Sequence, residues 1–270
     1  VKGVSFVGST PVARHVHALA SQHGKRVQAL GGAKNFMVVL PDAPLEKSVA
    51  TALESAIGCA GQRCLAGSVI VCVGDETYDR VKEKMVASAS DVSVGDGMDP
   101  NVQLGPIISQ ESKDRVIGLI ESAVTDGAKL LLDGRKNLPA GRGYFLRTSV
   151  IGDVTESMRV AREEIFGPVV LLARAKSLDE AIAWINRSPL ANTTTIFTSS
   201  GPAARKFCSE VHPSMIGVNI GVPAPMSFFS FGGSKDSFFG DIKAHGADSV
   251  RFFTYEKIIT QRWEANSNVW

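Results

Sequence analysis

Short apolar segments alternate with longer amphipathic segments along most of this chain. Short apolar runs predict strands, and apolar residues that recur every three or four positions predict helices. The predicted strands are residues 4–7, 27–30, 36–40, 68–73, 129–132, 145–151, 169–174, 193–198, 216–219 and 250–255. The predicted helices are residues 12–22, 44–59, 76–89, 110–125, 178–186 and 202–211. Strands that alternate with helices predict an α/β fold with a largely parallel sheet.

The segments between these elements carry capping and turn signals. Ser9 or Thr10 is expected to cap the first helix, and Asp42 the second. We expect a domain boundary at the pair Gly31-Gly32, which could act as a hinge. Residues 227–240 are rich in Phe, Gly and Ser, and we expect a long loop there.

Composition and charge exclude several classes of protein. The 270 residues include 29 basic and 27 acidic ones, so the net charge of +2 gives no electrostatic reason to expect a nucleic-acid or anionic-membrane partner. No apolar run approaches the length that a bilayer crossing needs. Four cysteines in a chain of this length do not make a disulfide scaffold, and they favour a reducing compartment. Residues 1–8 have no initiator Met and are typical of a strand already under way, so we expect that the upstream part of a longer protein is missing.

A strand, a turn and a helix meet at Phe6-Val7-Gly8-Ser9-Thr10. Such a turn offers backbone N–H groups and a helix N-terminus to an anion such as a cofactor phosphate. It is not the G-x-G-x-x-G dinucleotide motif, and a capped helix after a strand explains the same residues.

Cys64 is the cysteine best placed for chemistry, because it follows the predicted turn Gly61-Gln62-Arg63. Arg63 would favour the thiolate and could also hold a substrate carboxylate. Packing is the competing explanation for any free cysteine, and we expect it for Cys72 in mid-strand and Cys208 in mid-helix.

Paired carboxylates, Glu163 and Glu164, precede Ile165-Phe166-Gly167-Pro168. They could be general acid–base groups or ribose ligands, or simply a solvated acidic turn. No metal site is expected, because Cys59 and Cys64 lack metal-site spacing and the histidines are scattered. The histidines are His15, His17, His23, His212 and His245.

Taken together, these segments resemble the aldehyde dehydrogenase superfamily. The resemblance rests on four motifs in order: residues 6–10, 30–32, 61–64 and 164–168. It implies the catalytic domain of that fold, plus the tail end of a Rossmann-like NAD-binding domain. It divides the chain into residues 1–31 (end of the NAD-binding domain), 32–225 (catalytic cysteine domain) and 226–270 (C-terminal return and oligomerisation segment).

The resemblance also assigns roles. Cys64 would be the nucleophile that forms a thioester, Arg63 would bind the substrate carboxylate, and NAD would be the hydride acceptor. The residues implied at NAD are Gly8 and Ser9 near the pyrophosphate, Glu164 at the nicotinamide ribose and Phe166 nearby.

Within the superfamily, residues 28–35 and 231–237 are most similar to the CoA-acylating methylmalonate-semialdehyde (malonate-semialdehyde) dehydrogenases. Hydrolytic relatives carry a glutamate where this chain has Ala29, and alanine cannot activate water. CoA is therefore implied as a co-substrate that takes the acyl group after decarboxylation. A homo-oligomer is also implied, a dimer or tetramer, in the cytoplasm (or the mitochondrial matrix in a eukaryote).

Two alternatives stay open at this point. One is a hydrolytic NAD(P)-dependent dehydrogenase of another semialdehyde, and the other is a truncated, non-catalytic chain that oligomerises. Ala13, Gly67 and Ser68 depart from the pattern of many relatives, which weakens the choice of substrate within the family.

Overall fold

The computed structural model describes residues 1–139 and 143–263, and it confirms an α/β fold with a mostly parallel main sheet. That sheet has seven strands in the order β10-β9-β3-β4-β7-β6-β5. Only β5 runs antiparallel to its neighbour. The bounds are β3 Asn35–Val39, β4 Gly67–Val73, β5 Lys129–Leu132, β6 Ser149–Gly152, β7 Val169–Ala175, β9 Thr193–Phe197 and β10 Met215–Val218.

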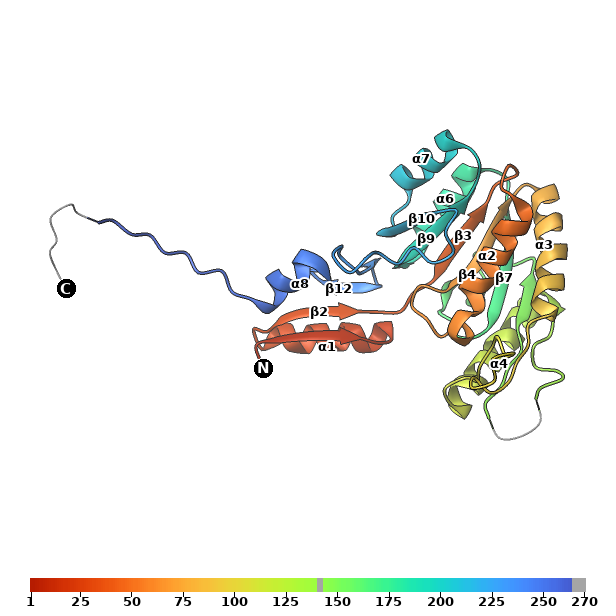
Figure 1. Cartoon of the computed structure of the whole chain (residues 1–270), viewed down its shortest axis with the longest axis horizontal. Coiled ribbons are helices and arrows are strands. Elements are labelled where there is room, and N and C mark those ends of the chain that lie inside the picture. Colours follow the sequence, from red (N-terminus) through yellow and green to blue (C-terminus); the bar gives the residue numbers. More distant parts are fainter. Residues whose placement is uncertain (140–142, 264–270) are drawn as a thin grey trace.

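Helices cover both faces of this sheet, which is why its central strands β3, β4 and β7 are buried along most of their length. The chain passes from β3 through α2 (Leu45–Ile57) to β4, and it returns from β7 through α6 (Leu178–Arg187) to β9. Because parallel crossovers are right-handed, opposite directions of travel place α2 and α6 on opposite faces. Helix α3 (Asp75–Ser90) packs beside α2, and α7 (Gly201–Glu210) packs beside α6 (Figure 1).

A second, smaller sheet lies beside the first (Figure 1). β1 (Gly3–Val7) and β2 (Arg26–Leu30) pair in parallel and are joined by α1 (Thr10–Gln22). β12 (Phe238–Gly240) returns from the far end of the chain and pairs antiparallel with β2. Just before it, β11 (Ser234–Lys235) pairs with β8 (Leu190–Ala191) of the larger unit.

The two sheets meet where β2 ends at Leu30 and β3 begins at Asn35. The carboxyl ends of β1 and β2 therefore face the amino ends of β3, β4 and β7. This junction brings the Gly8-Ser9 turn toward the segments that lead into β4 and β7.

Several sequence-based predictions were wrong. Residues 250–255 do not form a strand: α8 (Gly246–Phe253) occupies most of that segment, and residues 254–263 are extended. A strand needs a partner for its backbone groups, and no described strand pairs there, whereas a helix satisfies those groups internally. The buried ring of Phe252 anchors α8 beneath the Arg26 side chain.

The predicted caps also differ. Ser9 occupies the N-cap position of α1 but makes no side-chain cap, and Thr10 instead accepts a hydrogen bond from the Gly32 N–H. Asp42 does not cap α2, because its carboxylate accepts hydrogen bonds from Thr198 and Ser199. Two predicted elements differ in extent: the strand predicted at 145–151 begins only at Ser149 and ends at Gly152, and the 227–240 loop contains β11 and β12.

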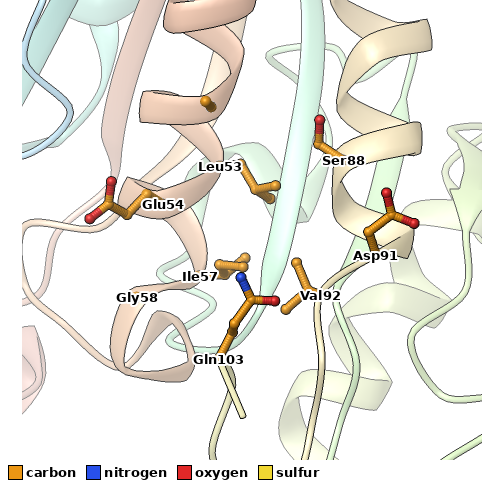
Figure 2. Close-up of a pocket in the computed structure, with 9 residues that line it drawn as sticks. Leu53, Glu54, Ile57, Gly58, Ser88, Asp91, Val92 and Gln103 are labelled. Atoms are coloured by element: carbon orange, nitrogen blue, oxygen red, sulfur yellow. The ribbon is translucent and has the colours of Figure 1, made fainter. Parts of the chain in front are cut away.

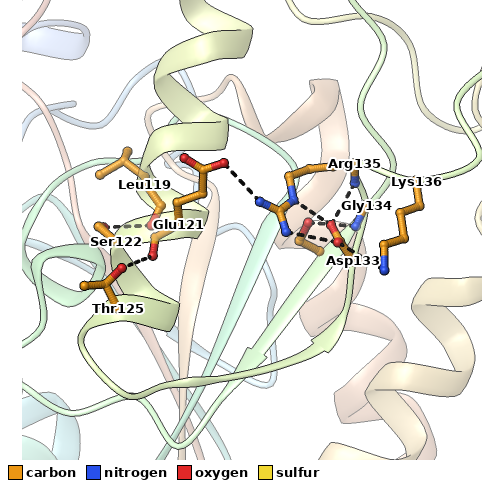
Figure 3. Close-up of polar contacts among 9 residues, drawn as sticks. Leu119, Glu121, Ser122, Thr125, Asp133, Gly134, Arg135 and Lys136 are labelled. Carbon is orange, nitrogen blue, oxygen red and sulfur yellow. Dashed lines mark hydrogen bonds and ion pairs between the residues drawn. The ribbon is translucent and has the colours of Figure 1, made fainter.

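An arginine holds the turn that follows β5 (Figure 3). The Arg135 guanidinium donates to both carboxylate oxygens of Asp133, at 2.8 and 3.0 Å, and reaches Glu121 on α4 (Gln110–Thr125) at 3.4 Å. The paired guanidinium lowers the pKa of Asp133. This cluster is structural and lies outside the site described below.

Two short helices complete the elements, η1 (Gly58–Gly61) and α5 (Arg159–Arg162). Within residues 1–139 and 143–263, no helix is long and apolar enough to cross a membrane.

Asp153 joins three elements at the end of β6. Its carboxylate pairs with Lys129 at 2.9 Å and with Arg174, and it accepts a hydrogen bond from the Tyr78 hydroxyl at 3.0 Å. Hydrogen bonds from Lys129, Arg174 and Tyr78 lower the pKa of Asp153 to about 2. Burial raises the pKa of Tyr78 to about 12, so this phenol stays a donor.

This cluster makes the stability of the fold depend on pH. Because the folded-state pKa of Asp153 is below the ordinary 3.8, its contribution is present above about pH 4 and is lost as the pH falls toward 2. Asp153→Asn should lower the melting temperature at pH 7 by about 2–6 °C. The difference in melting temperature between this variant and the parent should shrink as the pH falls from 4 to 2. Calorimetry against pH measures this, with the exposed Asp241→Asn as a control that leaves the curve unchanged. An equal difference in melting temperature at pH 7 and pH 2 would contradict the stabilising role of the ionised Asp153 carboxylate.

Candidate functional site

A cleft of about 810 Å³ lies at the junction of the two sheets. It brings together five of the six residues that the sequence singled out: Gly8, Ser9, Cys64, Glu164 and Phe166. The sixth, Arg63, lies just behind the cleft, where it shares a small space with Glu164 and Phe166. The other residues that line the cleft are Val7, Thr10, Pro11, Gly31, Gly32, Arg115, Arg162, Glu163, Pro189 and Leu190.

The turn that carries Cys64 packs closely on the loop that carries Glu164. Gly61 has φ +66°, and a side-chain carbon there would lie 2.1 Å from the Gly167 carbonyl oxygen. Only glycine allows both this left-handed backbone and this close approach. Gly61 therefore fixes the cysteine and the glutamate in neighbouring positions.

Cys64 is a half-buried thiol held in its neutral form. Burial raises its pKa, and the nearby Glu164 carboxylate raises it further. The backbone N–H groups of Cys64 and Leu65 and the charge of Arg63 lower the pKa, but they do not overcome burial. As predicted from the sequence, the charge of Arg63 favours the thiolate, but desolvation is the larger effect on the Cys64 pKa.

The other cysteines have ordinary environments. Cys72 is buried in β4, as predicted, and burial raises its pKa to about 12. Cys208 is exposed on α7, so the prediction that it packs in the core was wrong. Cys208 lies on the outer face of that helix, whereas its neighbour Phe207 points into the core.

Arg63 keeps unused hydrogen-bonding capacity. One terminal nitrogen donates to the Ser55 carbonyl at 3.2 Å, and the buried Nε has no partner among the described residues. A buried guanidinium N–H without an acceptor is costly, and a carboxylate would satisfy it.

Glu164 is mostly buried, and burial raises its pKa. The Ala33 N–H and the charges of Lys34 and Arg115 oppose this rise. Gly32 lies against the carboxylate, because a side-chain carbon at Gly32 would be 2.8 Å from Oε2. The glutamate thus has few partners of its own and faces the cleft.

Two cations that the sequence analysis did not single out hold the glutamate loop. Lys34, completely buried, donates to the Glu163 carbonyl at 2.8 Å, and desolvation lowers its pKa to about 7. Arg115 on α4 donates to the carbonyls of Glu164, at 3.1 Å, and Ile165. A lysine two residues before the predicted apolar strand 36–40 was a signal that could have revealed Lys34, but nothing local marked Arg115.

The Gly8-Ser9 turn presents the N-terminus of α1 to the same cleft. The Ser9 side chain makes no cap, so its hydroxyl and the first N–H groups of the helix are available to an anion. Among the described residues, no group of three His, Cys, Asp or Glu side chains could hold a metal ion.

A second cavity, of about 410 Å³, lies between α2 and α3 (Figure 2). Its wall combines the apolar Leu53, Ile57 and Val92 with the acidic Glu54 and Asp91. None of the residues singled out by the sequence lines it. The cleft at the sheet junction is therefore the candidate site.

Comparisons with known proteins show which family the chain resembles. A sequence profile described as "Aldehyde dehydrogenase family" matches residues 1–259. The chain is 47% identical to malonate-semialdehyde dehydrogenase 1 of Geobacillus thermodenitrificans over 264 residues, which are 97% of this chain and 54% of that protein. The chain thus spans about half the length of the curated relatives that it matches.

Solved structures give the same picture. A putative methylmalonate-semialdehyde dehydrogenase from Sinorhizobium meliloti, complexed with NAD, superposes with a TM-score of 0.97 at 41% identity. The match covers 99% of this chain and 55% of that one. The methylmalonate-semialdehyde dehydrogenase of Oceanimonas doudoroffii gives a TM-score of 0.96 at 43% identity, over 98% of this chain and 55% of that one.

The Glu164 carboxylate should suppress the reactivity of the Cys64 thiol in the unliganded protein. Removing its charge with Glu164→Gln lowers the pKa of Cys64, so the rate of alkylation by iodoacetamide at pH 7.5 should rise about 2- to 5-fold. Mass spectrometry of the Cys64 peptide measures the rate. Glu163→Gln makes the same charge change one residue away and should leave the rate near that of the parent. An equal rise in both variants would contradict the specific role of Glu164.

Proposed function

Since the chain belongs to the aldehyde dehydrogenase family, we propose that it carries the catalytic portion of a CoA-acylating semialdehyde dehydrogenase. The substrate is malonate or methylmalonate semialdehyde, the oxidant is NAD, and the acyl group passes to CoA. The observation that carries this proposal is the meeting of Cys64, Glu164 and the Gly8-Ser9 turn in one cleft. The relatives named for these semialdehydes support the choice of substrate.

The proposed division of the chain follows the two sheets. Residues 1–31 correspond to the end of an NAD-binding domain, 32–225 to the catalytic domain, and 226–270 to the C-terminal return and oligomerisation segment. The separate β1-β2-β12 sheet and the crossing at Gly31-Gly32 support the first boundary. Residues 264–270 of the last segment lie outside the described part.

The residues of the cleft fit NAD. The uncapped α1 N-terminus at Gly8 and Ser9 suits a pyrophosphate, the desolvated Glu164 carboxylate suits ribose hydroxyls, and the partly exposed Phe166 ring offers a flat apolar surface. When bound, NAD supplies a hydride acceptor.

The chain's own residues perform the rest of the reaction. The Cys64 sulfur, once deprotonated, adds to the aldehyde carbon, and loss of hydride from that carbon leaves an acyl thioester on Cys64. Arg63 holds the substrate carboxylate; the bond between the carboxylate and the α-carbon then breaks, CO₂ leaves, and the α-carbon takes up a proton. The thiol of CoA then displaces Cys64, which regains its proton. For malonate semialdehyde the products are acetyl-CoA, CO₂ and NADH.

Ala29 supports acyl transfer over hydrolysis. Its side chain is fully buried in β2 and carries no group that could take a proton from water. The thioester therefore lacks a general base at this position, and the CoA thiol becomes its acceptor.

We also propose that the whole protein is a homo-oligomer in the cytoplasm. Support for assembly comes from Tyr255, Ile258, Ile259 and Trp263, which are all exposed on the extended segment after α8. Support for the compartment comes from the four cysteines, which are all free.

The first test of the function measures NADH formation from malonate semialdehyde and NAD, with and without CoA. Turnover should require CoA and yield acetyl-CoA, and Cys64→Ala should abolish the acyl-enzyme detected by intact-protein mass spectrometry. Release of free acid at the same rate without CoA would contradict acyl transfer. A covalent acyl adduct retained in Cys64→Ala would contradict the nucleophile.

A second test concerns recognition of the carboxylate and needs no turnover. Malonate semialdehyde should protect Cys64 from iodoacetamide at about 10-fold lower concentration than propanal, which lacks the carboxylate. Arg63→Gln should remove most of this difference, while protection by propanal stays the same. If Arg63→Gln weakens protection by both aldehydes equally, the substrate carboxylate does not bind Arg63.

A further inference from the structure

The peptide bond between Cys64 and Leu65 is held by side chains from two different strands. The carbonyl oxygen of Cys64 accepts hydrogen bonds from Asn35 Nδ2 and from Asn192 Nδ2, each at 2.9 Å. Asn35 begins β3, and Asn192 immediately precedes β9. Two side-chain amides on one backbone carbonyl make an unusually complete set of donors for a turn.

Both asparagines are themselves fixed in place. Asn35 is buried, its Nδ2 also donates to the Ala66 carbonyl at 2.9 Å, and its Oδ1 accepts from the Thr193 N–H at 3.2 Å. Asn192 is buried as well, and β3 and β9 are paired neighbours in the sheet. The carbonyl is therefore held by the rigid sheet and not by another loop.

The held carbonyl determines where the other side of the same peptide points. In a trans peptide the C=O and N–H groups point in opposite directions, and all described peptide bonds are trans. The N–H of this peptide belongs to Leu65, and it lowers the pKa of the Cys64 thiol. Donors on the carbonyl side also polarise the peptide, which strengthens its N–H as a donor.

We propose that Asn35 and Asn192 are positioning residues that lock the Cys64–Leu65 peptide so that its N–H stays aimed at the Cys64 sulfur. Neither side chain touches the reacting atoms. They act through the backbone, which supplies a fixed dipole to the thiolate when it forms. This inference rests on the proposed role of Cys64 as the nucleophile.

The test compares Asn192→Leu with the matched control Thr194→Val. Asn192→Leu removes one donor at nearly constant size. Thr194→Val removes the buried hydrogen bond that the Thr194 hydroxyl donates to the Phe36 carbonyl. This change leaves the Cys64–Leu65 peptide untouched. Alkylation of Cys64 is followed by peptide mass spectrometry from pH 6 to pH 11.

In Asn192→Leu the alkylation rate at pH 7 should fall about 3- to 10-fold. The midpoint of the curve of alkylation rate against pH should move to higher pH, while the rate at the high-pH plateau should stay unchanged. Thr194→Val should retain the parent profile. A profile in Asn192→Leu that matches the parent, or equal shifts in both variants, overturns the proposal.

The remaining cysteines act as internal references. Alkylation of the exposed Cys59 and Cys208 should be the same in all variants, and the buried Cys72 should be labelled only if the fold is lost. If Asn192→Leu exposes Cys72, the smaller change Asn192→Ala, which also withdraws the donor, replaces it in the same comparison. The measurement needs neither semialdehyde nor NAD, so a failure of the dehydrogenase proposal leaves its result unaffected.

Discussion

The site depends on the few residues that cross from one sheet to the other between Leu30 and Asn35. This crossing sets the carboxyl ends of β1 and β2 against the amino ends of β3, β4 and β7. The ends of β1 and β2 contribute a turn and a helix N-terminus. The segments that lead into β4 and β7 contribute the Cys64 thiol and the Glu164 carboxylate. The close approach of Gly32 to Glu164 shows how little space the crossing leaves.

Desolvation governs the electrostatics of this junction. Burial raises the pKa of both Cys64 and Glu164 and lowers that of Lys34 to about 7. All three shifts favour the uncharged forms of the groups. Burial therefore shifts these three pKa values more than any single charged neighbour does.

The sequence predicted the larger elements well, because their signals are local. The amphipathic run 110–125 and the apolar run 129–132 match α4 and β5 in full. The prediction for residues 250–255 was wrong because a strand forms only where another strand pairs with it. The sequence of the segment alone does not show whether such a partner exists. The Cys208 prediction failed because a mid-helix position does not say which face it occupies.

The candidate site was predictable only in part for the same reason. Motifs of consecutive residues drew attention to Ser9, Cys64 and Glu164, and the family resemblance connected them. Lys34, Arg115 and Asn192 were missed because each acts on a residue more than forty positions away in the chain. Their roles exist only after the sheets have formed.

The pairing of β12 with β2 has a consequence for how this chain is made. Leu30 lies opposite Phe238, so the smaller sheet cannot gain its third strand until about two hundred further residues have left the ribosome. During that time β2 presents an open edge, which is a place where wrong strands can pair. Synthesis of β12 thus completes the sheet that β1 and β2 begin.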